Sequence, residues 1–132
     1  MSNRFKTCLL IDDNYIDNFV TTKMLESNNF AGEIIASQSP EDAIEALRIG
    51  TIKPDVIFLD IRMPEMSGFE FLEEYDKISI ENKADVKIFM LSSSLDPRDI
   101  KNSLVNKHVT QFIHKPVTTK ALDEMFSHDL SC

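Results

Sequence analysis

The chain has 132 residues, of which 42% are hydrophobic and 27% are charged, as is ordinary for a single globular domain. With 14 Lys and Arg against 22 Asp and Glu the net charge is −8, and no basic cluster of the kind that binds nucleic acid is present. No apolar run approaches the roughly 20 residues of a membrane span, and no signal-peptide pattern is present. We therefore expect one cytoplasmic domain over residues 1–132, without a nucleic-acid or membrane partner.

Five short apolar segments alternate with helical patterns along the chain. The first segment is followed by Asn14, a favourable N-cap, and then by apolar residues at helical spacing: Ile16, Phe19, Val20 and Met24. Ser39-Pro40 begins a second helix that stops at Gly50, because Pro suits the first helical position and Gly the position after the last. The predicted strands are residues 8–11, 33–36, 56–59, 86–91 and 111–114.

Three further helices complete the alternation. A pattern of Phe69, Phe71, Leu72 and Tyr75 predicts the third, and Asp96-Pro97 begins the fourth, with Ile100, Leu104 and Val105 as its apolar positions. Thr118 begins the last helix. Such alternation, with nearly continuous apolar strands, favours an α/β fold in which helices cover both faces of a parallel sheet. Right-handed crossovers then bring the carboxyl ends of all strands to one edge, where ligands bind in such folds.

Four of the five predicted strands end in residues that carry chemistry. Strand one is followed by Asp12 and Asp13, and strand three ends in Asp60, which we expect to be partly exposed. Strand four ends in Ser92 and strand five in Lys115, whereas strand two offers nothing charged. Each residue alone has a plain structural explanation, since an Asp caps a helix or turn and a Lys lies on the surface. Their coincidence at one edge favours a binding site instead.

Three carboxylates held close together repel one another unless a cation neutralises them. Mg²⁺ prefers oxygen ligands and keeps several waters, so that one or two carboxylates and a backbone carbonyl suffice. A lysine and a hydroxyl on the other side of such a site are suited to holding a phosphoryl group. Asp60 lies centrally and is itself a candidate nucleophile that would form an acyl phosphate.

Four motifs in this order resemble the receiver domain of two-component response regulators, in particular the stand-alone chemotaxis receiver. They are "LLIDDN", "VIFLDIRMPEMSGFEFL" with its Asp-x-x-Met-Pro-x-x-x-Gly pattern, "IFMLSSS" and "FIHKP", within a similarity that runs from about residue 5 to about residue 129. The resemblance implies a flavodoxin-like five-stranded parallel sheet in the order 2-1-3-4-5. It covers essentially the whole chain.

The resemblance also assigns roles to individual residues. Asp60 matches the phosphoacceptor; the implied Mg²⁺ ligands are Asp13, Asp60 and the Arg62 backbone carbonyl, with Asp12 acting through water. Ser92 matches the switch hydroxyl and Lys115 the lysine that binds the phosphoryl group. Phe112 matches the aromatic switch position, and Pro116 follows Lys115 in a peptide bond that is usually cis in this family.

These roles imply a single-domain response regulator and not an enzyme with an external substrate. It would accept a phosphoryl group on Asp60, in a Mg²⁺-dependent reaction, from a histidine kinase or a histidine phosphotransfer protein. We expect no output domain after the last helix, so that a separate and unidentified target protein would read the surface formed by the fourth helix, fifth strand and fifth helix.

Three alternatives remain open at this point. A phosphatase of the haloacid dehalogenase type carries an Asp-x-Asp motif, whose second Asp acts as acid and base. In this chain Arg62 stands at that position, two residues after Asp60, and we expect no cap domain. A flavin-binding module on the same fold needs a hydroxyl-rich phosphate loop where this chain has Asp12-Asp13, which would repel phosphate. A receiver-shaped module that is never phosphorylated is disfavoured, because the set of site residues is intact.

Overall fold

The computed structural model describes residues 4–80 and 83–130, with side chains described as far as residue 124. Five parallel strands form one sheet in the order β2-β1-β3-β4-β5. Their bounds are Phe5–Ile11 for β1, Ala31–Ser37 for β2, Val56–Asp60 for β3, Lys87–Ser92 for β4 and Val109–His114 for β5. All five predicted strands are therefore present, with boundaries shifted by up to three residues, and the strand order is the one implied by the resemblance.

In the described part of the chain, four α-helices connect the strands and a fifth follows β5. They are α1 (Tyr15–Ser27), α2 (Pro40–Ile49), α3 (Gly68–Lys77), α4 (Pro97–Val105) and α5 (Thr119–Leu130), together with a short 3₁₀ helix, η1 (Lys83–Asp85). The predicted N-caps are confirmed, because the side chains of Asn14, Ser39 and Asp96 each accept a hydrogen bond from a backbone N–H of the first turn. Gly50 follows α2 with a φ of 83°, a left-handed conformation that glycine adopts without steric cost.

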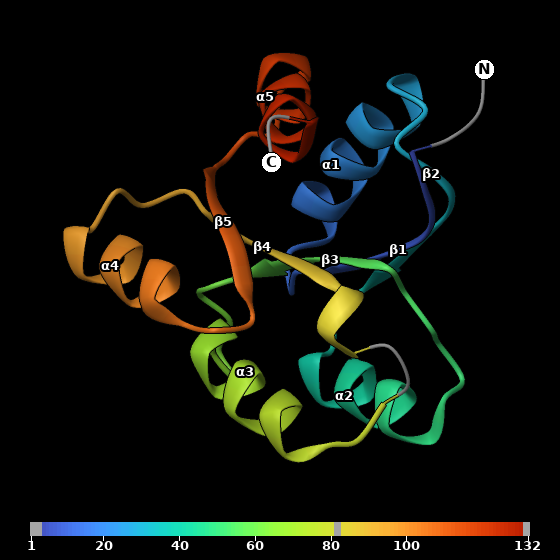
Figure 1. The fold of residues 1–132 in the computed structure, drawn as a ribbon. Coiled ribbons are helices and arrows are strands. Elements are labelled where there is room, and N and C mark those ends of the chain that lie inside the picture. The colour runs from blue at the N-terminus through green and yellow to red at the C-terminus, as the bar shows by residue number, and fades with distance from the viewer. Residues whose placement is uncertain (1–3, 81–82, 131–132) are drawn as a thin grey trace.

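Helices cover both faces of the sheet, as Figure 1 shows: α1 and α5 lie on one face, α2 and α3 lie on the other, and α4 lies beside the edge strand β5. Neighbouring residues of a strand point to opposite faces, which divides the core in two. On β1, for example, Leu10 packs with Leu25 and Phe30 on the α1 side, whereas Leu9 packs with the residues of α2 and α3. All five residues of the central strand β3 are buried.

The apolar residues in the first two turns of α1 lie on the side of the helix that faces away from the sheet. The buried residues of this helix are Asn18, Thr21 and Leu25. By contrast, Ile16 is 69% exposed and Phe19 is 54% exposed. The helix predicted from these residues is confirmed, but of its predicted apolar stripe only Met24 packs against the core.

Helix α4 is also lightly packed. Ser103 is its only buried residue, although Ile100, Leu104 and Val105 had suggested an apolar face. Leu104 is 61% exposed and Val105 is 72% exposed. Within the described residues, no helix is long and apolar enough to cross a membrane.

Candidate functional site

The carboxyl edge of the sheet brings the predicted charged residues into contact around the ammonium group of Lys115. Its Nζ lies 2.5 Å from Oδ2 of Asp12 and 3.1 Å from Oδ1 of Asp60. All three side chains are shielded from solvent, with exposures of 11% for Lys115, 2% for Asp12 and 7% for Asp60. Residues that are far apart in the chain therefore form one buried ionic cluster, as the strand ends predicted.

A second group of contacts at the same edge consists of oxygen atoms alone. Carboxylate oxygens of Asp12, Asp13 and Asp60 all lie within 4.8 Å of one another. Two oxygens bound to one Mg²⁺ lie at most about 4 Å apart, since each bond is about 2.0–2.1 Å long. Small side-chain rotations would therefore bring these oxygens into the coordination shell of one ion. The donor set consists of hard oxygen ligands and fits Mg²⁺.

Asp12 and Asp13 differ in how their carboxylates are occupied. Asp12 is buried, and besides binding Lys115 it accepts a hydrogen bond from the backbone N–H of Asn14 at 3.0 Å. The carboxylate of Asp13 is half-buried and has no hydrogen-bond partner among the described residues. Asp13 is thus the carboxylate of this cluster that is most readily available to a cation.

Asp60 is more buried than the sequence suggested, and its charge is correspondingly costly. We expected partial exposure, but the residue is only 5% exposed because the tip of β3 lies between β1 and β4. Burial, reinforced by the negative charge of Asp12, raises the pKa of Asp60 to about 6, although Lys115 acts in the opposite direction. At neutral pH most of the molecules therefore carry an ionised, poorly solvated carboxylate at this position.

For Lys115, in contrast to Asp60, the neighbouring charges outweigh the effect of burial on the pKa. Burial by itself lowers the pKa of its ammonium group, but hydrogen bonds to Asp12 and Asp17, together with the charge of Asp60, outweigh burial and raise the pKa above its ordinary value. The cation of this site consequently stays charged over the whole physiological range of pH.

Ser92 ends β4 beside this cluster. The preceding residue, Leu91, pairs with Asp60 in the sheet, and the carbonyl of Ser92 accepts a hydrogen bond from the backbone N–H of Lys115 at 2.8 Å. The Ser92 side chain is buried, and its Oγ accepts a hydrogen bond from the N–H of Ser94 at 3.0 Å. The hydroxyl therefore stands between the strand that carries Asp60 and the strand that leads to Lys115. The Lys115–Pro116 peptide bond is cis, as the resemblance implied.

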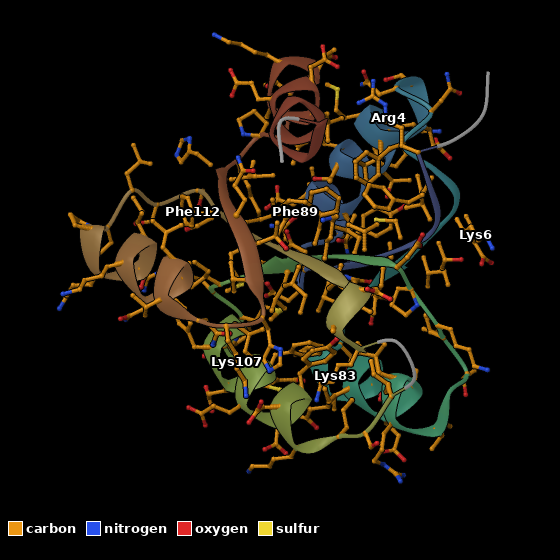
Figure 2. The ribbon with its side chains drawn as sticks, in the orientation of Figure 1. Arg4, Lys6, Lys83, Phe89, Lys107 and Phe112 are labelled. Atoms are coloured by element: carbon orange, nitrogen blue, oxygen red, sulfur yellow. The ribbon has the colours of Figure 1, made fainter. Side chains whose placement is uncertain are left out.

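Phe112 lies on β5 opposite Met90 of β4. It is half-buried and packs against the core cluster on the α3 side of the sheet. Figure 2 shows it beside β5, toward α4. Its position is compatible with the predicted switch, but its role stays a prediction.

The turn after Asp60 is shaped by Gly68 and Ser67. The backbone N–H of Gly68 donates to the carbonyl of Ile61 at 2.8 Å, and a Cβ at Gly68 would lie 2.7 Å from the carbonyl oxygen of Asp60. Ser67 and Glu70 form a reciprocal capping box that starts α3. This cap was not predicted from the sequence, although the Ser-x-x-Glu spacing is its signature.

Two further contacts of the site were not predicted. The Arg62 side chain reaches away from the cluster and binds Asp99 of α4, with Nη2 to Oδ2 at 2.6 Å. Asp17 of α1 binds Lys115, with Oδ2 to Nζ at 3.0 Å. In the sequence, Asp17 is recognisable only as an acidic residue in the first turn of a helix. This position gave no reason to place it in the site.

Comparison with known proteins agrees with the fold. A family model described as "Response regulator receiver domain" matches residues 8–127. A solved two-component response regulator from Cytophaga hutchinsonii has a TM-score of 0.85 at 30% identity, covering 98% of this chain and 100% of that one. A response regulator receiver protein from Dyadobacter fermentans has a TM-score of 0.82 at 32% identity, covering 93% of this chain and 96% of that one. The chain belongs to the family of response regulator receiver domains.

Curated relatives are longer than this chain. An uncharacterized response regulatory protein from Vibrio parahaemolyticus is 29% identical over 136 residues, which cover 92% of this chain and 52% of that protein. A relative from Vibrio cholerae is 41% identical over 71 residues, 53% of this chain and 29% of that protein. The chain thus spans about half, or less, of the length of these relatives.

Proposed function

We propose that Asp60 accepts a phosphoryl group from a phosphohistidine, which is supplied by a histidine kinase or a histidine phosphotransfer protein. The observation that carries the proposal is the buried cluster in which Asp60 contacts Lys115 and lies within reach of the oxygens of Asp12 and Asp13. A carboxylate held at a strand tip among groups that bind oxyanions is suited to becoming an acyl phosphate.

In the proposed transfer, an Oδ of ionised Asp60 attacks phosphorus. The new O–P bond forms while the P–N bond of the phosphohistidine breaks, and the imidazole nitrogen takes the bonding electron pair. Lys115, and Ser92 after rotation of its hydroxyl, would each bind one oxygen of the transferred group. A pKa of about 6 leaves Asp60 ionised, and hence nucleophilic, at neutral pH.

A Mg²⁺ ion belongs to this proposal, since the oxygen donors described above fit it. Asp13, Asp60 and the backbone carbonyl of Arg62 would bind the ion directly, and Asp12, whose carboxylate is held by Lys115, would bind through water. The ion would supply positive charge that offsets the crowded carboxylates and the incoming phosphoryl oxygens.

The phosphoryl donor would dock on α1. This helix starts directly after Asp13 and exposes Tyr15 (67%), Ile16 (69%), Phe19 (54%) and Val20 (48%). A donor must bring its imidazole to the carboxyl edge of the sheet, and this apolar surface adjoins that edge through the contact of Asp17 with Lys115. Exposed apolar patches of this kind mark protein interaction sites.

The output would be a changed protein surface. Movement of Ser92 and Lys115 toward the phosphoryl group would let Phe112 reorient, and α4, β5 and α5 would present a different face to a target protein. The light packing of α4, where Ser103 alone is buried, supports the proposal that this element shifts at low cost.

The experiment is intact-mass analysis after incubation with phosphoramidate, a small donor with a P–N bond, with and without Mg²⁺. We expect gain of one phosphoryl group only with Mg²⁺, and no gain for Asp60→Asn, because an amide is not a nucleophile toward phosphorus. Asp55→Asn is the matched control: Asp55 stands at the other end of the same strand, where its carboxylate accepts from the N–H groups of Lys6 and Thr7. Equal labelling of Asp60→Asn and wild type would show that the acceptor is another residue.

A further inference from the structure

Three carboxylates surround the ammonium group of Lys115, and one of them is outside the site that the resemblance predicts. Besides Asp12 and Asp60, the ammonium binds Asp17, with Nζ to Oδ2 at 3.0 Å. A lysine ammonium has three N–H donors. Three carboxylates within 3.1 Å therefore account for the whole binding capacity of this cation.

The three carboxylates differ in what it costs to release them. The Asp12 side chain is 2% exposed and that of Asp60 is 7% exposed, so separation from Lys115 would leave a buried charge without a partner. The Asp17 side chain is 43% exposed, and water can solvate it as soon as Lys115 moves away. Asp17 is thus the partner that Lys115 gives up most easily.

Asp17 is held in place by the helix that carries it. Its backbone N–H donates to the Asn14 side chain at 3.0 Å, the N-cap bond that starts α1. The contact with Lys115 joins α1 to the residue that follows β5, across 98 positions of the chain. An acid in the first turn also interacts favourably with the helix dipole, so the alternative role of Asp17 is to stabilise α1 alone.

We propose that Asp17 is a positioning residue that competes with the phosphoryl group for Lys115. It holds the ammonium in the unphosphorylated protein, and its bond to Lys115 is the one exchanged for a bond to a phosphoryl oxygen. The exchange sets how much of the phosphorylated protein adopts the switched state. The attraction between Asp17 and Lys115 opposes the binding of Lys115 to the phosphoryl group, and so lowers the population of the switched state. This inference rests on the proposed function of Asp60.

The test measures the affinity of the Mg²⁺-loaded protein for beryllofluoride, a mimic of the phosphoryl group, by ¹⁹F NMR titration. Asp17→Asn is expected to bind the mimic about three- to tenfold more tightly than wild type, as for loss of one partly exposed competing charge. Asp17→Glu restores the charge and should return the affinity toward the wild-type value. Glu65→Gln is the matched control, because it removes the same charge from an exposed residue near Asp60 that has no partner among the described residues.

A double-mutant cycle with Lys115→Ala separates competition from a general effect of negative charge. In the Lys115→Ala protein, Asp17→Asn should leave the affinity for beryllofluoride unchanged. If this protein binds beryllofluoride too weakly to titrate, the rate of Mg²⁺-dependent labelling by phosphoramidate is measured instead for all members of the cycle. A gain that persists without Lys115, or an unchanged or weaker affinity of Asp17→Asn, would overturn the role of Asp17 while leaving Asp60 as the acceptor. A wild-type protein that takes neither the mimic nor a phosphoryl group would overturn both proposals.

Discussion

Asp60 is a charged residue placed where charge is costly, at the buried tip of the central strand. Its pKa in the folded protein is about 6, against an ordinary value of 3.8. The folded protein therefore holds the Asp60 proton more tightly than the unfolded chain does. As pH rises from about 4 through 6, ionisation of Asp60 lowers the free energy of unfolding. The residue suited to nucleophilic attack thus destabilises the metal-free protein.

Asp60→Asn should stabilise the metal-free protein in a pH-dependent way. The gain in unfolding free energy is expected to be small near pH 4 and to rise through pH 6 to about 2–3 kcal/mol, because the amide carries no charge to desolvate. Urea unfolding in EDTA, followed by circular dichroism between pH 4.5 and 7.5, measures this difference. Asp55→Asn, whose carboxylate accepts two backbone N–H groups, should give no such gain. A difference in unfolding free energy between Asp60→Asn and wild type that stays constant over this pH range would show that ionisation of Asp60 is not its cause.

At the level of single residues, the charged cluster could be predicted because its members stand at the end of a strand or directly after it. Asp12, Asp60 and Lys115 meet as expected from the topology of a parallel sheet. Asp17 could not be found in this way, since it lies inside α1 and enters the site only through the direction of its side chain. The depth of Asp60 was also missed, because the sequence does not say which side chains cover the tip of β3.

At the scale of elements, α1 shows where the pattern of apolar residues misleads. Its Asn18 side chain packs inward and donates to the carbonyl of Asp12 at 2.8 Å, whereas Phe19 faces solvent. The polar inward residue ties the helix to the end of β1, and the outward apolar surface is the proposed docking site of the phosphoryl donor. Apolar spacing predicted the helix correctly, but only tertiary contacts determine which of its faces is buried.

Phe19→Ala should slow phosphotransfer from a protein donor without changing the chemistry of the site. We expect the rate of transfer from a phosphorylated histidine phosphotransfer domain to fall about tenfold, as for loss of one aromatic anchor. Labelling by phosphoramidate should stay at the wild-type rate, because Asp60 and its neighbours are unchanged. Exposed Ile49 of α2, which lies away from the proposed docking surface, provides the control as Ile49→Ala. Equal slowing of both donors by Phe19→Ala would indicate damage to the site and not to docking.

At the scale of the whole molecule, α4 links the proposed site to the proposed output surface. It carries one buried residue, and its first turn is tied to the segment after Asp60 by the ion pair of Arg62 with Asp99. Asp99 is 14% exposed and Arg62 is 62% exposed, so this contact is a partly solvated one. It nevertheless joins the residue whose carbonyl is a proposed Mg²⁺ ligand to the helix of the proposed output surface. The resemblance to receiver domains implied the strand order, but nothing in the sequence indicated this contact between two connecting segments.

Asp99→Asn should loosen α4 selectively. Hydrogen exchange of the amides of residues 97–105 is expected to become about two- to fivefold faster, the effect of losing a surface ion pair worth about 0.5–1 kcal/mol. Amides of α1 and the central strands should keep their wild-type rates. Glu74→Gln, which breaks the ion pair of Glu74 with Lys77 within α3, is the control. Unchanged exchange in α4 would show that the pair with Arg62 does not hold this helix.

Gly68 carries no functional group, yet the position of Asp60 depends on it. A single methyl group there would press on the peptide that carries Asp60 at 2.7 Å, on the Cα of Ile61 at 3.0 Å and on the Sδ-bound methyl of Met90 at 3.0 Å. The least disruptive response would be to push the tip of β3 outward, and the reactive oxygen would travel with it. In a library of every single substitution scored for labelling, position 68 would therefore group with the acidic residues, although its variants keep every charged residue of the site.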